Sequence, residues 1–276
     1  GRASIARHLP LIAGIEAVGE IIESNGKRFR PGDWVIAHGM GLGIERDGGL
    51  AEYLRVDESW LVALPKGLKP IEAATLGVAG FSAALAIDWL EQSGVVPGKG
   101  PIAVTGASGG VGSIAINMLS RRGFSVTAIS SKSDMDSRLR AFGATDVIVL
   151  PATDSKRSIE RGLWAGSVDT VGSDSLGWLI RTTLPGGMIM SIGNAGGNAL
   201  QTSVIPFILR GISLVGINSN SPVALRRRIW DRLASDLKPA ILADIRHEIG
   251  IEDIPQVMHS MIAGETSGRY VVNMTH

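Results

Sequence analysis

The stretch "VTGASGGVGSIAI", from Val104 to Ile116, decides the fold of this 276-residue chain, because its glycines stand between two different apolar patterns. The preceding "IAVT" is typical of a short buried strand, whereas "GSIAINMLSRRG" is typical of a helix that ends at Gly123. A second strand pattern, "SVTAIS", follows directly. Strand, glycine turn, helix and strand in this order predict a dinucleotide-binding unit, although a glycine turn can also end a strand in a fold that binds no ligand.

The glycines of this turn have separable roles in such a unit. Gly106 permits a sharp exit from the strand, and Gly109 and Gly110 let backbone amides at the helix N-terminus approach a pyrophosphate. Gly112 lets the helix pack closely on the sheet. The letters "GASGG" also match the nucleophile elbow of serine hydrolases, but the acid and histidine partners of a triad are missing, so the sequence favours a nucleotide site.

The end of the second strand indicates which dinucleotide the site would hold. An enzyme that uses NAD usually carries an acidic residue here for the ribose hydroxyls, whereas this chain reads "SSKSD" from Ser130 to Asp134, with Arg138 in the following helix. Hydroxyl donors and cations suit a phosphate, which a carboxylate would repel. The sequence therefore predicts NADP. The alternative is that Lys132 is a solvated loop residue and that Asp134 or Asp136 contacts the ribose.

Strand and helix patterns alternate from "IAVTG" to "ISLVGINS", which predicts an α/β fold with a doubly wound parallel sheet. Before Pro70 the pattern is β-rich, with the short runs "EAVGEIIES", "DWVIAHG" and "GLAEYLRV" between turn residues. The apolar run "AATLGVAGFSAALAI" lies between these regions and predicts a helix buried between layers, because it is too short to cross a bilayer. After Pro222 we expect a basic amphipathic helix, a strand, a helix and a closing strand.

Composition excludes several classes of partner and site. Lys and Arg total 27 against 26 for Asp and Glu, so no basic excess predicts binding to nucleic acid or to an anionic membrane. The chain has no cysteine, which excludes disulfides, thiolate zinc sites and a cysteine nucleophile. Its histidines show no HxH or HExxH spacing, so no metal site is expected. We expect a small-molecule partner, no membrane span and, since no signal peptide is recognised, a cytoplasmic protein.

Five segments together resemble the medium-chain dehydrogenase/reductase superfamily: "GASGGVGS", "WAGSVDTVG", "PFILRGISLVGINS", "GGLAEYLRV" and "GVAGFSAALAI". The resemblance is to its zinc-free, quinone-oxidoreductase-like branch, and most of all to NADPH-dependent acrylyl-CoA reductases. It implies a homodimer, with a GroES-like catalytic domain made from residues 1–80 and 220–276 and a Rossmann domain at residues 81–219. Such relatives carry a further N-terminal segment with several strands and an Asn-Tyr-Lys-Asp stretch. We therefore expect the GroES-like, β-rich domain to be N-terminally truncated here, either because the sequence is a fragment or because the protein is a truncated relative.

The resemblance also assigns residues to the cofactor. The pyrophosphate would contact Ser108, Gly109, Gly110 and Val111, and the 2′-phosphate would contact Ser130, Ser131 and Lys132. The ribose or adenine would lie near Thr170, and the nicotinamide would lie near Leu214, Ser219 and residues 193–197. Arg269 would reach back to the cofactor phosphates. The alternative for each is an ordinary structural role, such as packing for Thr170 and Leu214 or a surface position for Arg269.

The function implied by the resemblance is NADPH-dependent reduction of the carbon–carbon double bond of a small 2-enoyl-CoA, such as acrylyl-CoA to propionyl-CoA. A quinone oxidoreductase and a non-catalytic NADPH-binding protein are the alternatives. No catalytic residue is assigned, because a lone histidine such as His38, after a strand, is interpreted as structural. The arginines at positions 226–228 start a helix and form either a solvated face or a site for the phosphates of coenzyme A.

Overall fold

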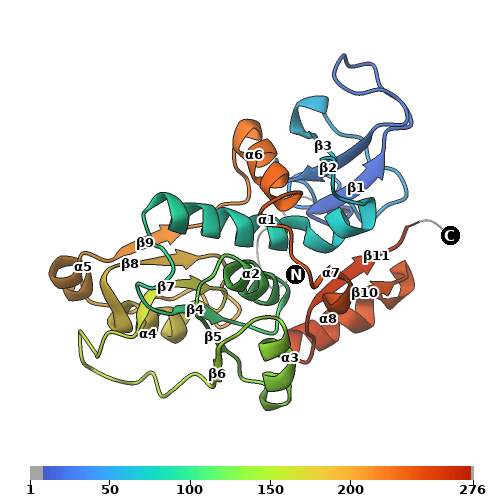
Figure 1. Cartoon of the computed structure of the whole chain (residues 1–276). Helices are drawn as coiled ribbons and strands as arrows, with labels where there is room; N and C mark the ends of the chain where they lie inside the picture. Colours follow the sequence, from blue (N-terminus) through green and yellow to red (C-terminus); the bar gives the residue numbers. More distant parts are fainter. Residues whose placement is uncertain (1–8, 275–276) are drawn as a thin grey trace. The chain divides into compact units, whose positions relative to one another are not determined.

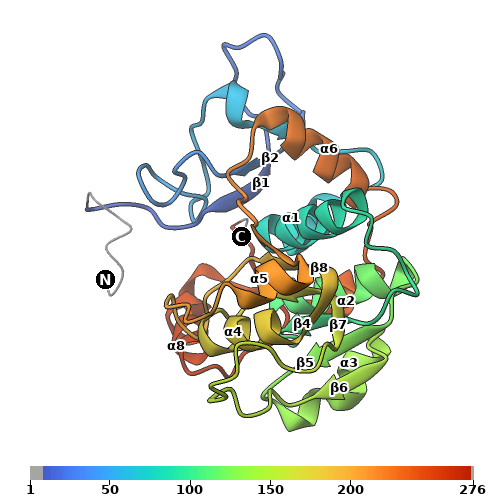
Figure 2. The same ribbon diagram turned by 90° about the vertical axis from the view of Figure 1, so that its left-hand side faces the viewer.

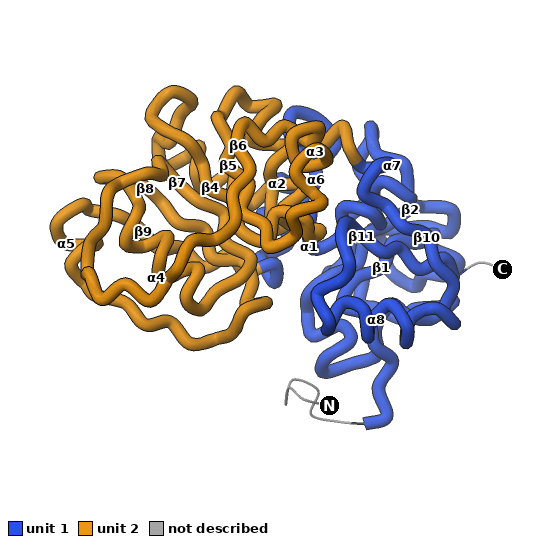
Figure 3. The backbone as a smooth tube through the Cα atoms, turned by 90° about the horizontal axis from the view of Figure 1, so that it is seen from below, with its two compact units in different colours: residues 1–81, 219–238, 242–276 blue, residues 82–218, 239–241 orange. Residues whose placement is uncertain are grey.

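A computed structural model describes residues 9–274 of the chain (Figure 1). The chain divides into two compact units (Figure 3). Unit 1 contains residues 1–81, 219–238 and 242–276, so it is built from both ends of the chain. Unit 2 contains residues 82–218 and 239–241 and therefore holds the glycine turn.

Unit 2 is built on a parallel sheet of six strands in the spatial order β6-β5-β4-β7-β8-β9. Its strands are β4 (Ile102–Thr105), β5 (Val126–Ile129), β6 (Asp146–Ile148), β7 (Trp164–Asp169), β8 (Thr183–Ser191) and β9 (Ser213–Gly216). Every residue of β4, β5 and β7 is buried, as expected for short apolar strands in a covered sheet. The chain runs outward from β4 to β6 and then from β7 to β9, so the strand order reverses between β4 and β7.

Helices connect these strands along the chain, except between β6 and β7, where residues 149–163 form no helix. They are α2 (Gly110–Arg121), α3 (Asp136–Ala141), α4 (Ser173–Thr182) and α5 (Ile205–Arg210), with a 3-10 turn η2 (Ser133–Met135) before α3. Helix α2 packs on β4 and β5, α4 packs on β7 and β8, and α5 lies against β8 (Figure 2). The core beside α4 includes Trp164 and Trp178, whose rings meet edge-on with centroids 5.7 Å apart. The parallel sheet with its alternating helices confirms the predicted doubly wound α/β fold.

The long apolar segment forms helix α1 (Pro70–Gln92). The helix extends beyond the apolar run, so the expectation that this segment is too short to cross a bilayer is wrong: within the described chain it is the one helix long and apolar enough to do so. Of its most apolar window, 72% is buried inside the structure. The sequence predicted an unbroken helix, but α1 is interrupted at Gly77, whose φ of 48° and ψ of −150° are not helical. A side chain here would collide with Glu16 and with Arg269, so the break depends on glycine.

Unit 1 contains an antiparallel sheet of β1 (Glu16–Glu20), β2 (Trp34–His38) and β3 (Val62–Ala63), and a parallel pair, β10 (Arg246–Ile249) and β11 (Arg269–Val272). Its other elements are α6 (Val223–Leu233), α7 (Leu242–Ile245), α8 (Ile254–Ile262) and the 3-10 turns η1 (Glu58–Trp60) and η3 (Ile251–Asp253). The basic helix, strand, helix and closing strand expected after Pro222 are present.

One expected strand of unit 1 is absent. The alternating run "GLAEYLRV", residues 49–56, contains no strand. Its first amides are used by the loop before β1, since the Gly49 N–H donates to Gly14 O at 2.9 Å and the Leu50 N–H donates to Ala13 O at 3.0 Å. Alternating side chains form a strand only where a neighbouring strand pairs with the backbone through hydrogen bonds. Here the loop before β1 forms those hydrogen bonds instead.

Candidate functional site

The reversal of strand order places the glycine turn at the edge of the sheet where open α/β folds bind ligands. Gly106 follows β4 with a φ of 59°, in the left-handed region, and a Cβ there would collide with Thr170 Oγ1. A Cβ on Gly112 would collide with the carbonyl oxygen of Gly106. Both positions therefore require glycine, which agrees with the roles inferred from the sequence.

The start of α2 has the chemistry of an anion site. Gly109 is its N-cap residue and supplies no side-chain cap, so the first amides of the helix have no partner within it. Ser108 is buried, while Gly110 and Val111 are half-buried. The Ser113 hydroxyl donates to the Gly109 carbonyl oxygen at 2.8 Å, which secures the first turn from within. A helix N-terminus with glycines at its entrance fits a pyrophosphate.

The segment after β5 carries the residues expected to select the dinucleotide. The Ser130 N–H donates to Ile148 O at 3.1 Å and so extends the strand pairing, and the Ser130 hydroxyl accepts from the Lys132 N–H at 3.1 Å. Ser131 is exposed, and Lys132 and Arg138 are half-buried. Hydroxyls and cations on one short segment fit a phosphate monoester.

The two aspartates considered as ribose ligands are placed differently from each other. Asp136 starts α3 and forms an ion pair with Arg140, with Nε and Oδ2 2.9 Å apart. Asp134 is exposed within η2. Arg138 lies in α3 with Asp136, and its guanidinium is 5.5 Å from the centroid of the Phe142 ring. Since Asp136 is already paired with Arg140, the arrangement favours the phosphate interpretation of this segment.

The end of β7 carries Thr170 and a buried carboxylate that the sequence analysis did not single out, Asp169. The Thr170 hydroxyl donates to Thr105 O at 2.9 Å, and the Asp169 carboxylate accepts from the Thr105 hydroxyl at 2.7 Å. The loop of residues 193–197 lies beside this segment, because the Gly196 N–H donates to Val171 O at 2.7 Å. The only sequence signal for Asp169 is its place at the end of the buried run "WAGSVD".

The two remaining residues assigned to the nicotinamide lie in different units. Leu214 lies in β9, pairs in register with Ile189 and packs against the core cluster that contains Ile189. Ser219 is half-buried and starts the second segment of unit 1. The packing role considered for Leu214 is thus present, and a contact of Leu214 or Ser219 with the nicotinamide stays a prediction.

Arg269 lies at the start of β11 and is bonded within unit 1. Its Nη2 lies 2.5 Å from Glu16 Oε1, and its Nε donates to Thr75 O at 2.9 Å. Glu16 also accepts from the Val78 N–H, directly after the break in α1. Arg269 is therefore a fixed cation rather than a solvated surface side chain, and its contact with the cofactor stays a prediction.

Unit 1 contains a cavity of about 1080 Å³. Its lining includes Glu16, His38, Trp230, Arg269 and Tyr270 beside apolar residues of β1 and β2. A volume of this size, with a few polar groups among apolar walls, is typical of sites for small organic molecules.

His38, at the end of β2, is part of a buried cluster. It is 2% exposed, its Nε2 accepts from the Trp230 indole N–H at 3.0 Å, and its ring centroid lies 4.8 Å from that of Phe81. Burial, aided by the nearby Arg226 guanidinium, lowers the pKa of His38 to about 3. The imidazole is therefore neutral at pH 7, and its surroundings agree with the structural interpretation.

The basic start of α6 divides into a buried part and an exposed part. Arg226 is fully buried and donates from Nη1 to His38 O at 2.7 Å, so a solvated phosphate cannot reach it. Arg227 and Arg228 are exposed. The phosphate hypothesis for residues 226–228 is therefore wrong for Arg226, because burial commits its guanidinium to the interior of unit 1.

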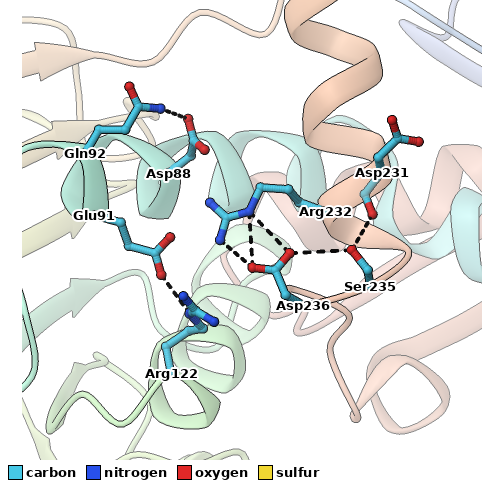
Figure 4. Close-up of polar contacts among 8 residues, drawn as sticks. All are labelled: Asp88, Glu91, Gln92, Arg122, Asp231, Arg232, Ser235 and Asp236. Carbon is cyan, nitrogen blue, oxygen red and sulfur yellow. Dashed lines mark hydrogen bonds and ion pairs between the residues drawn. The ribbon is translucent and has the colours of Figure 1, made fainter.

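Further along α6 the charges are paired (Figure 4). Arg232 Nη2 lies 2.5 Å from Asp236 Oδ2, and the Ser235 hydroxyl donates to Asp231 O at 2.7 Å. In unit 2, Arg122 pairs with Glu91 at 2.7 Å (Figure 4). The exposed arginines of α6, Arg227 and Arg228, therefore lie in its second turn, before this paired end.

Comparison with known proteins gives two family matches. Residues 2–66 match the family described as "Alcohol dehydrogenase GroES-like domain", and residues 110–235 match "Zinc-binding dehydrogenase". The second family is described as zinc-binding, but within residues 9–274 of this chain no group of three or more His, Asp or Glu side chains is arranged to hold a metal ion.

Individual relatives match almost the whole chain. The putative quinone oxidoreductase YhfP of Bacillus subtilis is 41% identical over 98% of this chain and 83% of its own length. The probable acrylyl-CoA reductase AcuI of Escherichia coli is 38% identical over 99% of this chain and 85% of its own length.

Two solved structures are similar throughout. That of E. coli YhdH with bound NADPH covers 99% of this chain and 85% of its own, at 38% identity and a TM-score of 0.97. The structure of B. subtilis yhfP with NAD bound covers 98% of this chain and 83% of its own, at 41% identity and a TM-score of 0.93. This chain therefore belongs to the medium-chain dehydrogenase/reductase superfamily of oxidoreductases, with quinone-oxidoreductase-like proteins and acrylyl-CoA reductases as its relatives.

Proposed function

We propose that the protein reduces the carbon–carbon double bond of a small 2-enoyl-CoA, such as acrylyl-CoA, with NADPH. The observation that carries the cofactor choice is the segment after β5, where Ser130, Ser131, Lys132 and Arg138 offer hydroxyls and cations in place of the usual acidic residue. The acrylyl-CoA reductase AcuI, 38% identical, supports the substrate class.

In this proposal most of the cofactor-binding residues belong to unit 2. The amides of Ser108, Gly109, Gly110 and Val111 hold the pyrophosphate at the positive end of α2. The segment from Ser130 to Lys132, with Arg138, holds the 2′-phosphate. Thr170 borders the ribose or adenine, Leu214, Ser219 and residues 193–197 border the nicotinamide, and Arg269 faces the phosphates.

Unit 1 binds the substrate in the same proposal, with residues 1–80 and 220–276 as the catalytic domain around the inserted cofactor domain at residues 81–219. NADPH, when bound, supplies a hydride for the β-carbon of the enoyl group, while the α-carbon takes a proton. This chain orients the thioester, shields it from water and donates hydrogen bonds to its carbonyl oxygen as negative charge develops there. The 1080 Å³ cavity is the proposed place for the acyl end.

The exposed arginines of α6 are proposed to contact the phosphates of coenzyme A. Arg227 and Arg228 present cations on one helical turn, and Arg–phosphate contacts are among the strong charge-assisted ones. Replacing Arg227 by Ala should raise the KM for acrylyl-CoA and leave the KM for a benzoquinone unchanged. Equal effects on both substrates would contradict the proposal.

A second candidate is NADPH-dependent quinone reduction, favoured by the 41% identity to the putative quinone oxidoreductase YhfP. The same cofactor site would serve both reactions, so the acceptor distinguishes them. The deciding experiment measures the consumption of NADPH and of NADH with acrylyl-CoA and with benzoquinone in parallel. A preference for NADPH and the thioester supports the first proposal, and a preference for the quinone supports the second. Saturable NADPH binding without turnover of either acceptor would indicate a non-catalytic binding protein.

We further propose a cytoplasmic location, because a chain without cysteines forms no disulfides and needs no oxidising compartment. We also propose a homodimer that forms through β9. Strand β9 ends the sheet order, and the neighbouring Val204, Ile208 and Leu209 are 66%, 69% and 70% exposed. Light scattering should give the mass of two chains, and Ile208→Glu should give the mass of one. A wild-type protein with the mass of one chain would contradict the dimer.

A further inference from the structure

The buried carboxylate of Asp169 lies where the strand order of unit 2 reverses. Asp169 is the last residue of β7, and Thr105 is the last residue of the neighbouring β4. Their side chains bond across this point, with Thr105 Oγ1 and Asp169 Oδ1 2.7 Å apart. In open parallel sheets the crevice beside such a reversal is where ligands bind, so this bond lies under the candidate cofactor site.

The surroundings of Asp169 are unusual for an acid. The side chain is 0% exposed, and none of the described cations pairs with it. Its carboxylate accepts instead from the Thr105 hydroxyl and from the amides of Gly172, at 2.9 Å, and Val171, at 3.4 Å. Burial raises the pKa of Asp169 and these bonds partly oppose the rise. The carboxylate is thus buried with hydrogen-bond donors in place of a counter-ion, and these donors offset part of the cost of burying it.

The bonds of Asp169 continue into the glycine turn. Thr105 Oγ1, which donates to Asp169, accepts from the Thr170 N–H at 3.0 Å, and the Thr170 hydroxyl donates to Thr105 O at 2.9 Å. The next residue after Thr105 is Gly106, and Thr170 Oγ1 occupies the space that a Cβ of Gly106 would need. The turn that leads into α2 therefore rests on Thr170, whose position depends on Thr105 and Asp169.

The same residue also fixes the loop after β8. The Asp169 carbonyl oxygen accepts from the amides of Ile192, at 2.8 Å, and Gly193, at 3.3 Å. Further along, Gly172 forms an isolated parallel bridge with Gly197. The glycine turn, the segment after β7 and the loop of residues 193–197 are thus joined in one network with Asp169 at its centre.

We propose that Asp169 is a positioning residue for the cofactor, acting through Thr105 and through the backbone of residues 170–172. It sets the relative positions of the three segments that border the cofactor in the proposed function, on which this inference rests. Because Asp169 is fully buried, this role needs no contact between its side chain and the cofactor.

The test compares two volume-conserving substitutions of buried threonines on adjacent strands. Thr105→Val removes the hydroxyl that links Asp169 to the turn, while Thr127→Val removes a buried hydroxyl of β5 and leaves every bond of the Asp169 network in place. The dissociation constant for NADPH is measured by fluorescence titration at a temperature where circular dichroism shows each variant folded. Thr105→Val should weaken NADPH binding by about tenfold and Thr127→Val should leave it unchanged.

Two further variants identify the hydroxyl and the acid as the cause. Thr105→Ser keeps a hydroxyl and should restore wild-type affinity, and Asp169→Asn should weaken NADPH binding as Thr105→Val does. The KM for NADPH should rise with the dissociation constant in each weakened variant, while the KM for acrylyl-CoA stays the same.

The inference is overturned if Thr105→Val binds NADPH as tightly as Thr127→Val does, or if Thr105→Ser fails to restore affinity. A wild-type protein that binds no NADPH would instead overturn the proposed function, and this inference with it. The two failures are distinguishable, because only the second is visible before any substitution is made.

Discussion

Two buried titratable residues end strands in the two units, and their partners differ. Asp169 ends β7 and accepts hydrogen bonds from a hydroxyl and from backbone amides of a loop that borders the candidate cofactor site. His38 ends β2 and meets the rings of Trp230 and Phe81 and the backbone-bound Arg226. Burial alone therefore does not separate a binding region from a packed one. The partners do, since the Asp169 network joins loops through hydrogen bonds, whereas the His38 cluster is held mainly by packed rings, of which His38 and Trp230 also line the cavity of unit 1.

The comparison predicts that substitutions in the His38 cluster change stability, while substitutions in the Asp169 network change ligand affinity. The largest effect is expected for Trp230→Ala, because Trp230 is fully buried and donates to His38. The free energy of unfolding should fall by about 4 kcal/mol, measured by urea denaturation followed by circular dichroism. Trp89→Ala is the control, since Trp89 is 43% exposed, and should cost less than about 1 kcal/mol. Similar losses of unfolding free energy in the two variants would contradict the stabilising role of the His38 cluster.

The pH dependence of stability gives the next effect. The pKa of His38 is about 3 in the folded chain against an ordinary value of 6.5, so the unfolded chain binds more protons between these values. Stability is thus present above pH 6.5 and is lost as the pH falls toward 3. Between pH 7 and pH 5 the free energy of unfolding should fall by about 2 kcal/mol from this residue.

Urea denaturation of His38→Gln should show a correspondingly smaller slope with pH, whereas His259→Gln, at an exposed position, should keep the slope of the wild type. A slope that His38→Gln leaves intact would mean that other groups control the acid transition. Asp169 acts in the opposite sense, because its raised pKa makes the folded chain the better proton acceptor in the acid range.

Ligand affinity also tests the segment after β5, which lies in the same unit as the Asp169 network. Replacing Lys132 by Ala should weaken NADPH binding by about tenfold and leave NADH binding unchanged, because only NADPH carries the 2′-phosphate. Lys156→Ala, at an exposed position of the same unit, is the control and should change neither. Equal losses for NADPH and NADH would mean that Lys132 does not contact the 2′-phosphate. Urea denaturation should place both variants at wild-type stability.

The smallest expected effect belongs to Thr170. Its hydroxyl donates to Thr105 O and supports the glycine turn, so Thr170→Val should weaken NADPH binding by about threefold. The free energy of unfolding should fall by about 1 kcal/mol. Thr170→Ser keeps the donor and should bind NADPH as the wild type does. A serine variant as weak as the valine variant would assign the effect to the lost methyl group instead.

The glycine turn of the candidate site could be predicted from the sequence, because the interactions that shape it are local. Gly106 and Gly112 lie within one short turn, and the sterics that require glycine there act between neighbours in the chain. The position of Ser130, Ser131 and Lys132 at the end of β5 could also be predicted, because they follow a strand that the hydrophobic pattern alone predicts.

Contacts between distant parts of the chain could not be predicted in this way. Asp169 and Thr105 are 64 residues apart, and Arg269 and Glu16 are 253 residues apart. Neither pair leaves a periodic signal, because each depends on which strands become neighbours. The break of α1 at Gly77 has the same origin, since its helical pattern continues through the position and the colliding groups come from β1 and β11.

The loop after β8 has a dynamic consequence. Residues 192–197 belong to no strand or helix, yet the amides of Ile192 and Gly193 donate to the carbonyl oxygen of Asp169, at the end of β7, and the Gly196 amide donates to that of Val171. Amides bonded in this way exchange their hydrogens with solvent only when the local structure opens. This loop should therefore exchange as slowly as the strand it follows. The amide resonances of residues 192–197 would then show whether an added nucleotide slows hydrogen exchange at this edge of the sheet or leaves it unchanged.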